Sequence, residues 1–160
     1  MANVMRWRYG DTKPVMADVD SGQTIEIGDF CWLNTDDVRS AAAQSDQGSE
    51  VTNQETFADN FLGVAMQQSR SADTDEIRLA TAGVFEFICA SATYEVGDLV
   101  GVDEASSGTA LEDQTVAAVT DAEYAIGRVA RRATSATTTL FVEIESTVMH
   151  GGIAGGTPSG

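Results

Sequence analysis

The chain has 160 residues, ordinary apolar content and a formal net charge of −16 at pH 7. That length suits one domain with its own hydrophobic core. The strong negative charge disfavours binding to nucleic acid or to anionic membranes. Residues 1–14 carry a side-chain balance of +2, so the remainder carries −18. We therefore expect a basic N-terminal segment on an acidic body, with no nucleic-acid partner and no membrane partner.

The N-terminal segment, residues 1–20, predicts an extended arm. Met5, Trp7 and Tyr9 alternate with Arg6 and Arg8, which is the period of a strand with one apolar and one basic face. Such a strand can add to a sheet edge, its own or a partner's, whereas the alternative is a frayed terminus. The candidate partner-binding residues are this run and three others: Met5, Arg6, Trp7, Arg8, Tyr9, Lys13, Phe141 and His150.

An internal repeat organises the body of the chain. Residues 25–31 read Ile-Glu-Ile-Gly-Asp-Phe-Cys, and residues 94–100 read Tyr-Glu-Val-Gly-Asp-Leu-Val. A capping-box signature and then a glycine-containing strand follow each copy, at 52–65 and again at 120–130. This order predicts two similar strand–helical-turn–strand halves, about 23–89 and 92–146, with a glycine-aspartate corner at the start of each.

Local patterns place the elements of the first half. We expect strands over 23–33, bent at Gly28 and Asp29, because glycine accepts a positive φ. A long polar surface loop over 34–51, with a short turn at 41–43, precedes a helix over 52–60 with Thr52 as its N-cap. Strands over 61–68 and 75–89 follow, the second with a bend or bulge at Gly83.

The second half opens at Tyr94 and continues with a loop over 103–114 and a capped turn over 120–124. Its closing strands lie at 125–132 and 138–146, where Phe141 faces outward as a candidate interface residue. The predicted fold is mainly β, with a single domain over 21–147. The Gly-rich tail, 148–160, lacks a hydrophobic stripe, so we expect a partner surface to hold it.

The sequence offers no clear catalytic, cofactor or metal site. His150 is the single histidine and stands at the start of the Gly-rich tail. Cys31 and Cys89 resemble small buried hydrophobic residues of a reduced compartment, although a disulfide between neighbouring strands stays open. The stretch 18–22 resembles the start of a calcium loop but lacks the glycine and glutamate that such loops need.

Two further features of the composition bear on partners and location. Arg128, Arg131 and Arg132 form the one dense basic cluster of the body and can pair with acidic groups of a neighbouring strand or of a partner. No segment has the run of about 18 apolar residues that a membrane helix needs, and the N-terminus lacks the apolar stretch of a signal peptide. We expect a soluble protein made in a cytoplasm.

An ordered set of short motifs resembles the small tailed-phage head-decoration, or capsid cement, proteins. The motifs are Ile-Gly-Asp at 27–29, Phe-Leu-Gly-Val-Ala at 61–65, Ile-Arg-Leu and Ala-Gly-Val-Phe within 77–85, Val-Gly-Asp-Leu-Val at 96–100, Ile-Gly-Arg-Val-Ala at 126–130 and Leu-Phe-Val-Glu-Ile at 140–144. The resemblance covers roughly residues 20–146 and leaves the 34–51 loop and the tail outside.

The resemblance implies a compact β-barrel or β-sandwich fold and a non-enzymatic virion protein that is made in the host cytoplasm. It would bind the outer capsid surface, with the major capsid protein and further copies of itself, as a homotrimer, for partners. Alternatives are a host-surface or glycan-binding module, another structural head or tail component, or a hydrolase that uses His150 or a carboxylate pair. If the arm docks on the capsid, deletion of residues 1–13 is expected to leave a folded domain that no longer binds shells.

Overall fold

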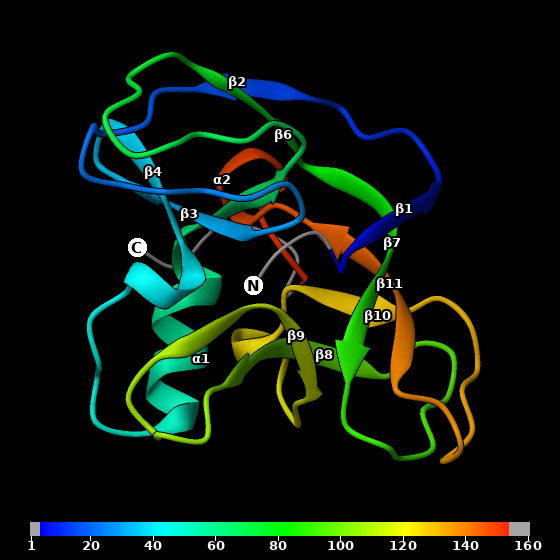
Figure 1. Ribbon diagram of the computed structural model, residues 1–160. Coiled ribbons are helices and arrows are strands. Elements are labelled where there is room, and N and C mark those ends of the chain that lie inside the picture. The colour runs from blue at the N-terminus through cyan, green and yellow to red at the C-terminus, as the bar shows by residue number, and fades with distance from the viewer. Residues whose placement is uncertain (1–3, 154–160) are drawn as a thin grey trace.

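The computed structural model describes residues 4–153, and the chain is mainly β (Figure 1). The strands are β1 (Arg6–Tyr9), β2 (Val15–Ala17), β3 (Phe30–Asn34), β4 (Asp37–Ser40), β5 (Phe61–Ala65), β6 (Ile77–Ala80), β7 (Ala82–Cys89), β8 (Leu99–Glu104), β9 (Leu111–Ala118), β10 (Gly127–Val129) and β11 (Thr139–Glu145). The helices are α1 (Glu50–Asn60), α2 (Thr147–His150) and the 3-10 helices η1 (Ala41–Ala43) and η2 (Ala122–Tyr124). The predicted fold class is confirmed.

The strands form two rings. In the second ring the order is β7-β11-β10-β8-β9, and β9 pairs in parallel with β7 to close a five-stranded barrel. In the first ring the order is β2-β6-β5-β3-β4, and a parallel bridge between Val19 and Val38 joins its two ends. Strand β1 pairs antiparallel with β7 and is not one of the five strands that close the barrel. The first ring lies above the second in Figure 1.

The two rings repeat the same hydrogen bonds as well as the same strand order. The amide of Gly28 donates to the carbonyl of Ala65 at 2.8 Å, and the amide of Gly97 donates to that of Val129 at 2.9 Å. A paired bridge between Ile25 and Ser69 in the first ring matches one between Tyr94 and Ala133 in the second. The internal repeat read from the sequence is therefore a structural duplication.

The duplication divides the chain at a different residue from the one predicted. Strand β7 was expected in the first half, but it pairs with β11 and β9 and belongs to the second ring. The repeated units therefore run from β2 to β6 and from β7 to β11, and Thr81 lies between them. The difference arises because alternation within 75–89 identifies strands but not the sheet that they join.

Glycine makes both the corners and the close strand contacts possible. Gly28 and Gly97 have φ values of 100° and 94°, a region that strains any residue with a side chain. Gly63 and Gly127 serve a second purpose, because a Cβ on them would lie 2.1 Å and 2.4 Å from a backbone carbonyl oxygen of the next strand. The same glycine positions recur in the two rings because the same backbone approach recurs.

Two segments predicted as loops contain regular structure. Residues 34–51 hold β4 and η1, and the expected turn at 41–43 is the 3-10 helix. Residues 103–114 are mostly the hairpin of β8 and β9, which shortens the loop between them to 105–110. The polar composition misled the prediction because these strands have one solvated face.

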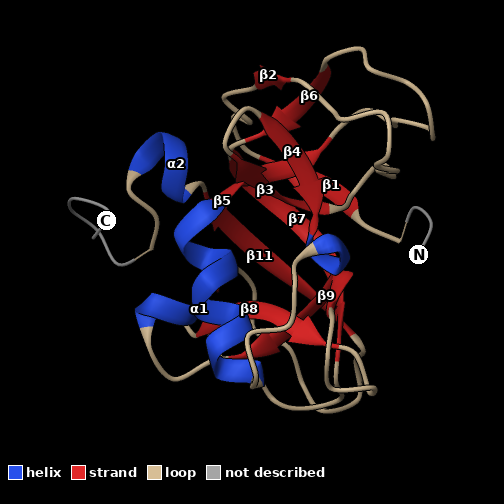
Figure 2. Cartoon of the chain, turned by 90° about the vertical axis from the view of Figure 1, so that its left-hand side faces the viewer, coloured by secondary structure: helices blue, strands red, loops and turns tan. Residues whose placement is uncertain are grey.

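The helix over 52–60 exists but begins earlier than predicted. Its N-cap is Ser49, whose hydroxyl accepts a hydrogen bond from the amide of Thr52 at 3.2 Å. Thr52, the predicted cap, therefore lies inside α1. Phe57 is fully buried, and its ring centroid lies 5.7 Å from that of Phe61. Figure 2 shows α1 and α2 on the same side of the strands.

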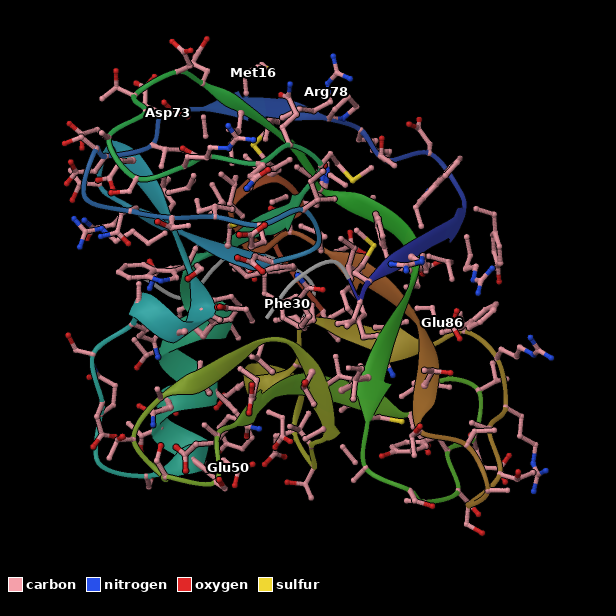
Figure 3. All side chains as sticks on the ribbon, in the orientation of Figure 1. Met16, Phe30, Glu50, Asp73, Arg78 and Glu86 are labelled. Atoms are coloured by element: carbon pink, nitrogen blue, oxygen red, sulfur yellow. The ribbon has the colours of Figure 1, made fainter. Side chains whose placement is uncertain are left out.

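Each ring has its own hydrophobic cluster. The smaller cluster fills the first ring and consists of Val19, Ile25, Cys31, Val38, Leu62, Ala65, Ile77 and Leu79. The larger cluster fills the barrel and extends beneath α1, with Phe30, Phe57, Phe61, Phe85 and Phe87 as its largest members. Phe30 comes from the first ring and lies 4.5 Å from Phe87 between ring centroids, so the two rings pack against each other through the larger cluster (Figure 3).

The terminal segments belong to the fold. The arm's strand prediction is confirmed, because residues 6–9 form β1, and residues 15–17 form β2 of the first ring. The predicted Gly-rich tail, 148–160, begins inside α2, whose cap is Ser146 and whose end is Gly151 in the left-handed conformation. The rest of that tail, from residue 154, lies outside the described residues.

Candidate functional site

Met5 belongs to the core, not to an outer surface. Its side chain is 6% exposed and packs against the corner of the first ring, where a Cβ on Gly28 would come within 2.6 Å of the Met5 Cβ. Its amide donates to Oε1 of the fully buried Gln114 at 3.0 Å. The alternation of Met5 with Trp7 and Tyr9 predicted that the three side chains share one face. Only Met5 is buried, because it lies between Gly28 of the first ring and Gln114 of the second.

The strongest cluster of predicted residues lies on the outside of the barrel, over β1, β7 and β11. The guanidinium of Arg8 lies 5.3 Å from the ring centroid of Phe141, and that of Arg131 lies 5.1 Å from the same centroid. Arg8 also forms an ion pair with Glu86, its Nε donating to Oε1 at 3.0 Å. The hydrogen bond from Arg8 lowers the pKa of Glu86. We call this cluster, with Arg132, the basic–aromatic face.

Alternation in β11 explains why Phe141 is available to both arginines. Leu140 and Val142 face the barrel core and are almost fully buried, so Phe141 faces outward. Its partner in β7 is Glu86, and β1 runs along the other side of β7. The fold thus brings Arg8 and Arg131, far apart in sequence, to one aromatic ring, where cation–π contacts hold their charges in place.

A hollow of about 300 Å³ adjoins this cluster. Its lining combines charged, hydroxyl and apolar side chains: Glu86, Arg131, Arg132, Ala133, Thr134, Thr137, Thr139 and Phe141. Arg132 pairs with Glu95 at 2.9 Å, but both side chains are more than half exposed, so this pair adds little stability. Arg131 forms no ion pair within residues 4–153. Its charge is held by the Phe141 ring and stays open to solvent.

A second hollow, also of about 300 Å³, contains three more of the predicted residues: Tyr9, Lys13 and His150. Thr81 donates its hydroxyl to the carbonyl oxygen of Lys13 at 2.6 Å. Its oxygen lies 3.0 Å from Nε2 of His150, so the imidazole donates the proton of that second bond. Through Thr81, His150 therefore links α2 to Lys13 in the segment between β1 and β2. The Thr81 hydroxyl, which is the hydrogen-bond partner of His150, already donates its own proton to Lys13.

The remaining two predicted residues lie on β1. Arg6 is exposed and its Nη1 donates to the carbonyl oxygen of Met5 at 2.8 Å. Trp7 pairs across the strands with Phe85, yet it is 50% exposed because β1 is an edge strand. Trp7 and Tyr9, 52% exposed, are the largest exposed aromatic side chains of the described residues.

Other chemistry is not assembled within residues 4–153. Cys31 and Cys89 are both buried and free, and burial raises the pKa of each thiol. No group of three or more His, Cys, Asp or Glu residues in this range could hold a metal ion. No helix in the same range is long and apolar enough to cross a membrane.

Comparison with known proteins finds structural similarity at low sequence identity. Neither a protein-family model nor a curated protein sequence matches the chain. The N base of the head fiber gp8.5 of bacteriophage phi29 superimposes with a TM-score of 0.47 and 13% sequence identity. That alignment covers 82% of this chain and 94% of the phage protein. Similarity at this level says nothing about what this chain binds, and the resemblance to capsid cement proteins stays a prediction.

The basic–aromatic face contains residues that the sequence did not single out as a site. Arg131 and Arg132 stood out only as part of a dense basic cluster with Arg128, and Glu86 did not stand out at all. Their common position depends on the order β1-β7-β11 in the sheet. The signal available in the sequence was a pair of arginines on a strongly acidic chain.

Proposed function

We propose that this protein is a structural virion component that binds the outer surface of a tailed-phage capsid and stabilises contacts between major capsid subunits. The ordered motifs that resemble capsid cement proteins support the choice of partner. The stack of Arg8 and Arg131 on Phe141 carries the proposal for how it binds. It is a preformed basic and aromatic surface on a chain with a net charge of −16.

Arginine and aromatic side chains are the residues that most often supply binding energy in protein interfaces. The two guanidinium groups are already placed by one ring, so docking immobilises fewer free side chains. The acidic remainder of the chain would be repelled by an acidic capsid surface, and the basic–aromatic face would be attracted to it. This contrast orients the protein as it approaches its partner.

The proposed stabilisation of the capsid shell follows from mass action. A protein that binds the assembled shell and not its separated subunits favours the assembled state. A homotrimer, the assembly that the resemblance implies, would place three copies of the face at one junction and add their contacts as multivalent binding. The expected location is therefore the outside of the virion.

Co-sedimentation with empty shells built from the major capsid protein tests this function. Arg131→Glu should weaken shell binding at least about tenfold, and added salt should weaken binding of the unmodified protein. Arg78→Glu is the matched control, because Arg78 is an exposed arginine of the first ring. Equal binding by both variants would remove the basic–aromatic face from the proposal.

The location of the protein in the virion tests the function independently of the face. Electron microscopy of labelled particles should place it at junctions between capsid subunits. A position at the base of a fibre or in the tail would replace capsid stabilisation by a different structural role. Binding of the purified protein to a glycan array, without binding to shells, would favour a host-surface module.

A further inference from the structure

Among residues 4–153, no backbone group pairs with the edge of β2 that faces away from β6. Met16 lies opposite Arg78 in the antiparallel pair of these strands (Figure 3). Arg78 directs its own amide and carbonyl to the other side, toward Gln67 and Met66. Residues of an antiparallel pair alternate between hydrogen-bonded and non-hydrogen-bonded positions. The amide and carbonyl of Met16 therefore point to the free edge of β2.

The second ring shows what fills an edge of this kind. Strands β2 and β6 of the first ring take the same places as β7 and β11 of the second. Met16 of β2 lies opposite Arg78 of β6, and Glu86 of β7 lies opposite Phe141 of β11, so Met16 corresponds to Glu86. The parallel bridge of Val19 likewise corresponds to that of Cys89. In the second ring, the edge at Glu86 pairs with β1. In the first ring, no strand of the described residues takes the equivalent place beside β2.

A groove of about 390 Å³ runs along this edge. Its apolar lining comes from β2, β3, β5 and α2, through Val15, Met16, Ala17, Leu33, Leu62, Val148 and Met149. Met16, Val148 and Met149 are 51%, 40% and 48% exposed, a concentration of open apolar surface on a chain that buries most of its other large aliphatic side chains. An extended segment laid along β2 would cover them.

The rim of the groove is acidic. Asp18, Asp36 and Glu76 line it, and none of them forms an ion pair within residues 4–153. We propose that the groove binds an extended segment of another protein, with apolar side chains flanked by lysine or arginine, which pairs with β2 as β1 pairs with β7. Backbone hydrogen bonds would supply affinity, and the groove and its rim would select the side chains.

The chain's own β1 does not serve as this segment. It is held against β7 by the ladder with Phe85 and Glu86 and by the ion pair of Arg8. The sequence of β1 nevertheless indicates what the ligand should contain. On the equivalent edge, the apolar residues Trp7 and Tyr9 alternate with the basic residues Arg6 and Arg8. The proposal goes beyond capsid docking and concerns a separate surface, so either can fail while the other stands.

A peptide with the sequence of residues 4–11 is the probe that this equivalence supplies. Labelled with fluorescein and added to the full chain, it should bind saturably, and NMR should show that the amide of Met16 becomes protected from exchange. A peptide with both arginines replaced by glutamate should bind at least about tenfold more weakly. Loss of protection at the amides of β1, without protection of Met16, would mean that the peptide exchanges with β1 and would overturn the assignment.

Two variants of the protein locate the binding. Met16→Pro removes the edge-facing amide, a change that edge strands tolerate, and should weaken binding at least about tenfold. The double variant Asp36→Lys and Glu76→Lys should do the same through charge alone, while Asp121→Lys and Glu123→Lys on the second ring should leave binding unchanged. No binding by the unmodified chain, or equal binding by all variants, would overturn the proposal. Dimers of the chain that Met16→Pro dissociates would assign the groove to a second copy instead.

Discussion

Asp29 and Asp98 close the same turn in the two rings, but only Asp29 is buried. Each carboxylate accepts a hydrogen bond of 2.9 Å from the amide three residues earlier, that of Glu26 or Glu95. Asp29 also accepts one of 2.9 Å from Nε2 of Gln114. Burial raises the pKa of Asp29 from 3.8 to about 6, despite the lowering effect of the Gln114 bond. The duplication thus supplies a buried carboxylate and an exposed copy of it.

This pair predicts how stability changes with pH. Between pH 6 and pH 4 the folded state binds a proton at Asp29 that the unfolded chain does not, so this group makes the protein more stable as pH falls. The shift corresponds to at most about 3 kcal/mol. Urea unfolding at pH 7.5 and pH 5 should therefore show a smaller gain for Asp29→Asn than for the unmodified protein. Asp98→Asn should keep the full gain, and equal gains in all three proteins would contradict the prediction.

Gln114 should be the most costly single polar residue to replace. It is fully buried and its Oε1 accepts from the amides of Val4 and Met5, while its Nε2 donates to Ile27 and Asp29. Gln114→Leu leaves these groups without partners, so we expect a loss of roughly 2–5 kcal/mol in the free energy of unfolding. Hydrogen exchange at residues 4–9 should accelerate with it.

The matched control for this change is Gln68→Leu, because Gln68 is an exposed glutamine. It should alter the free energy of unfolding by less than about 0.5 kcal/mol. A Gln114→Leu protein as stable as this control would show that the network of Gln114 does not hold the N-terminal strand.

The glycines at equivalent strand positions should be intolerant of a methyl group. A Cβ on Gly63 or on Gly127 would lie 2.1 Å or 2.4 Å from a carbonyl oxygen, and backbone cannot move aside as a side chain can. Gly63→Ala and Gly127→Ala should each cost about 3 kcal/mol in the free energy of unfolding, the upper end of the usual range for an overpacked site. Gly22→Ala, which has nothing within 4 Å, should be nearly neutral. Similar melting temperatures for all three would exclude a tight backbone approach.

Removal of the N-terminal strand should destabilise the protein, although the sequence predicts that deletion of residues 1–13 leaves a folded domain. Deletion of residues 1–9 removes the buried Met5 and uncovers the β7 edge. Loss of Met5 alone should cost about 2–5 kcal/mol, the range for emptying a buried methionine site. Met5→Ala tests this separately, and Arg6→Ala is the exposed control. A deletion protein with an unchanged melting temperature would show that the N-terminal strand does not stabilise the fold.

The local features of this protein could be predicted from its sequence. The repeated Glu-x-Gly-Asp segments predicted corners in which Gly28 and Gly97 have positive φ, and alternation predicted most strands, including β11 with Phe141 facing outward. These features depend on residues a few positions apart: a glycine without a Cβ, or a period-2 pattern. They can therefore be predicted before the fold is known.

The pairing of the strands and the contacts of their faces could not be predicted in this way and depend on the folded chain. It moved β7 into the second ring, buried Met5 against Gly28 and placed Arg8 and Arg131 on one aromatic ring. An alternating segment presents the same pattern to any sheet edge, because its backbone groups carry no sequence information. Which strands pair depends on contacts between residues far apart in the chain. The free edge of β2 was therefore identified only by comparison with the equivalent edge of β7, which β1 occupies.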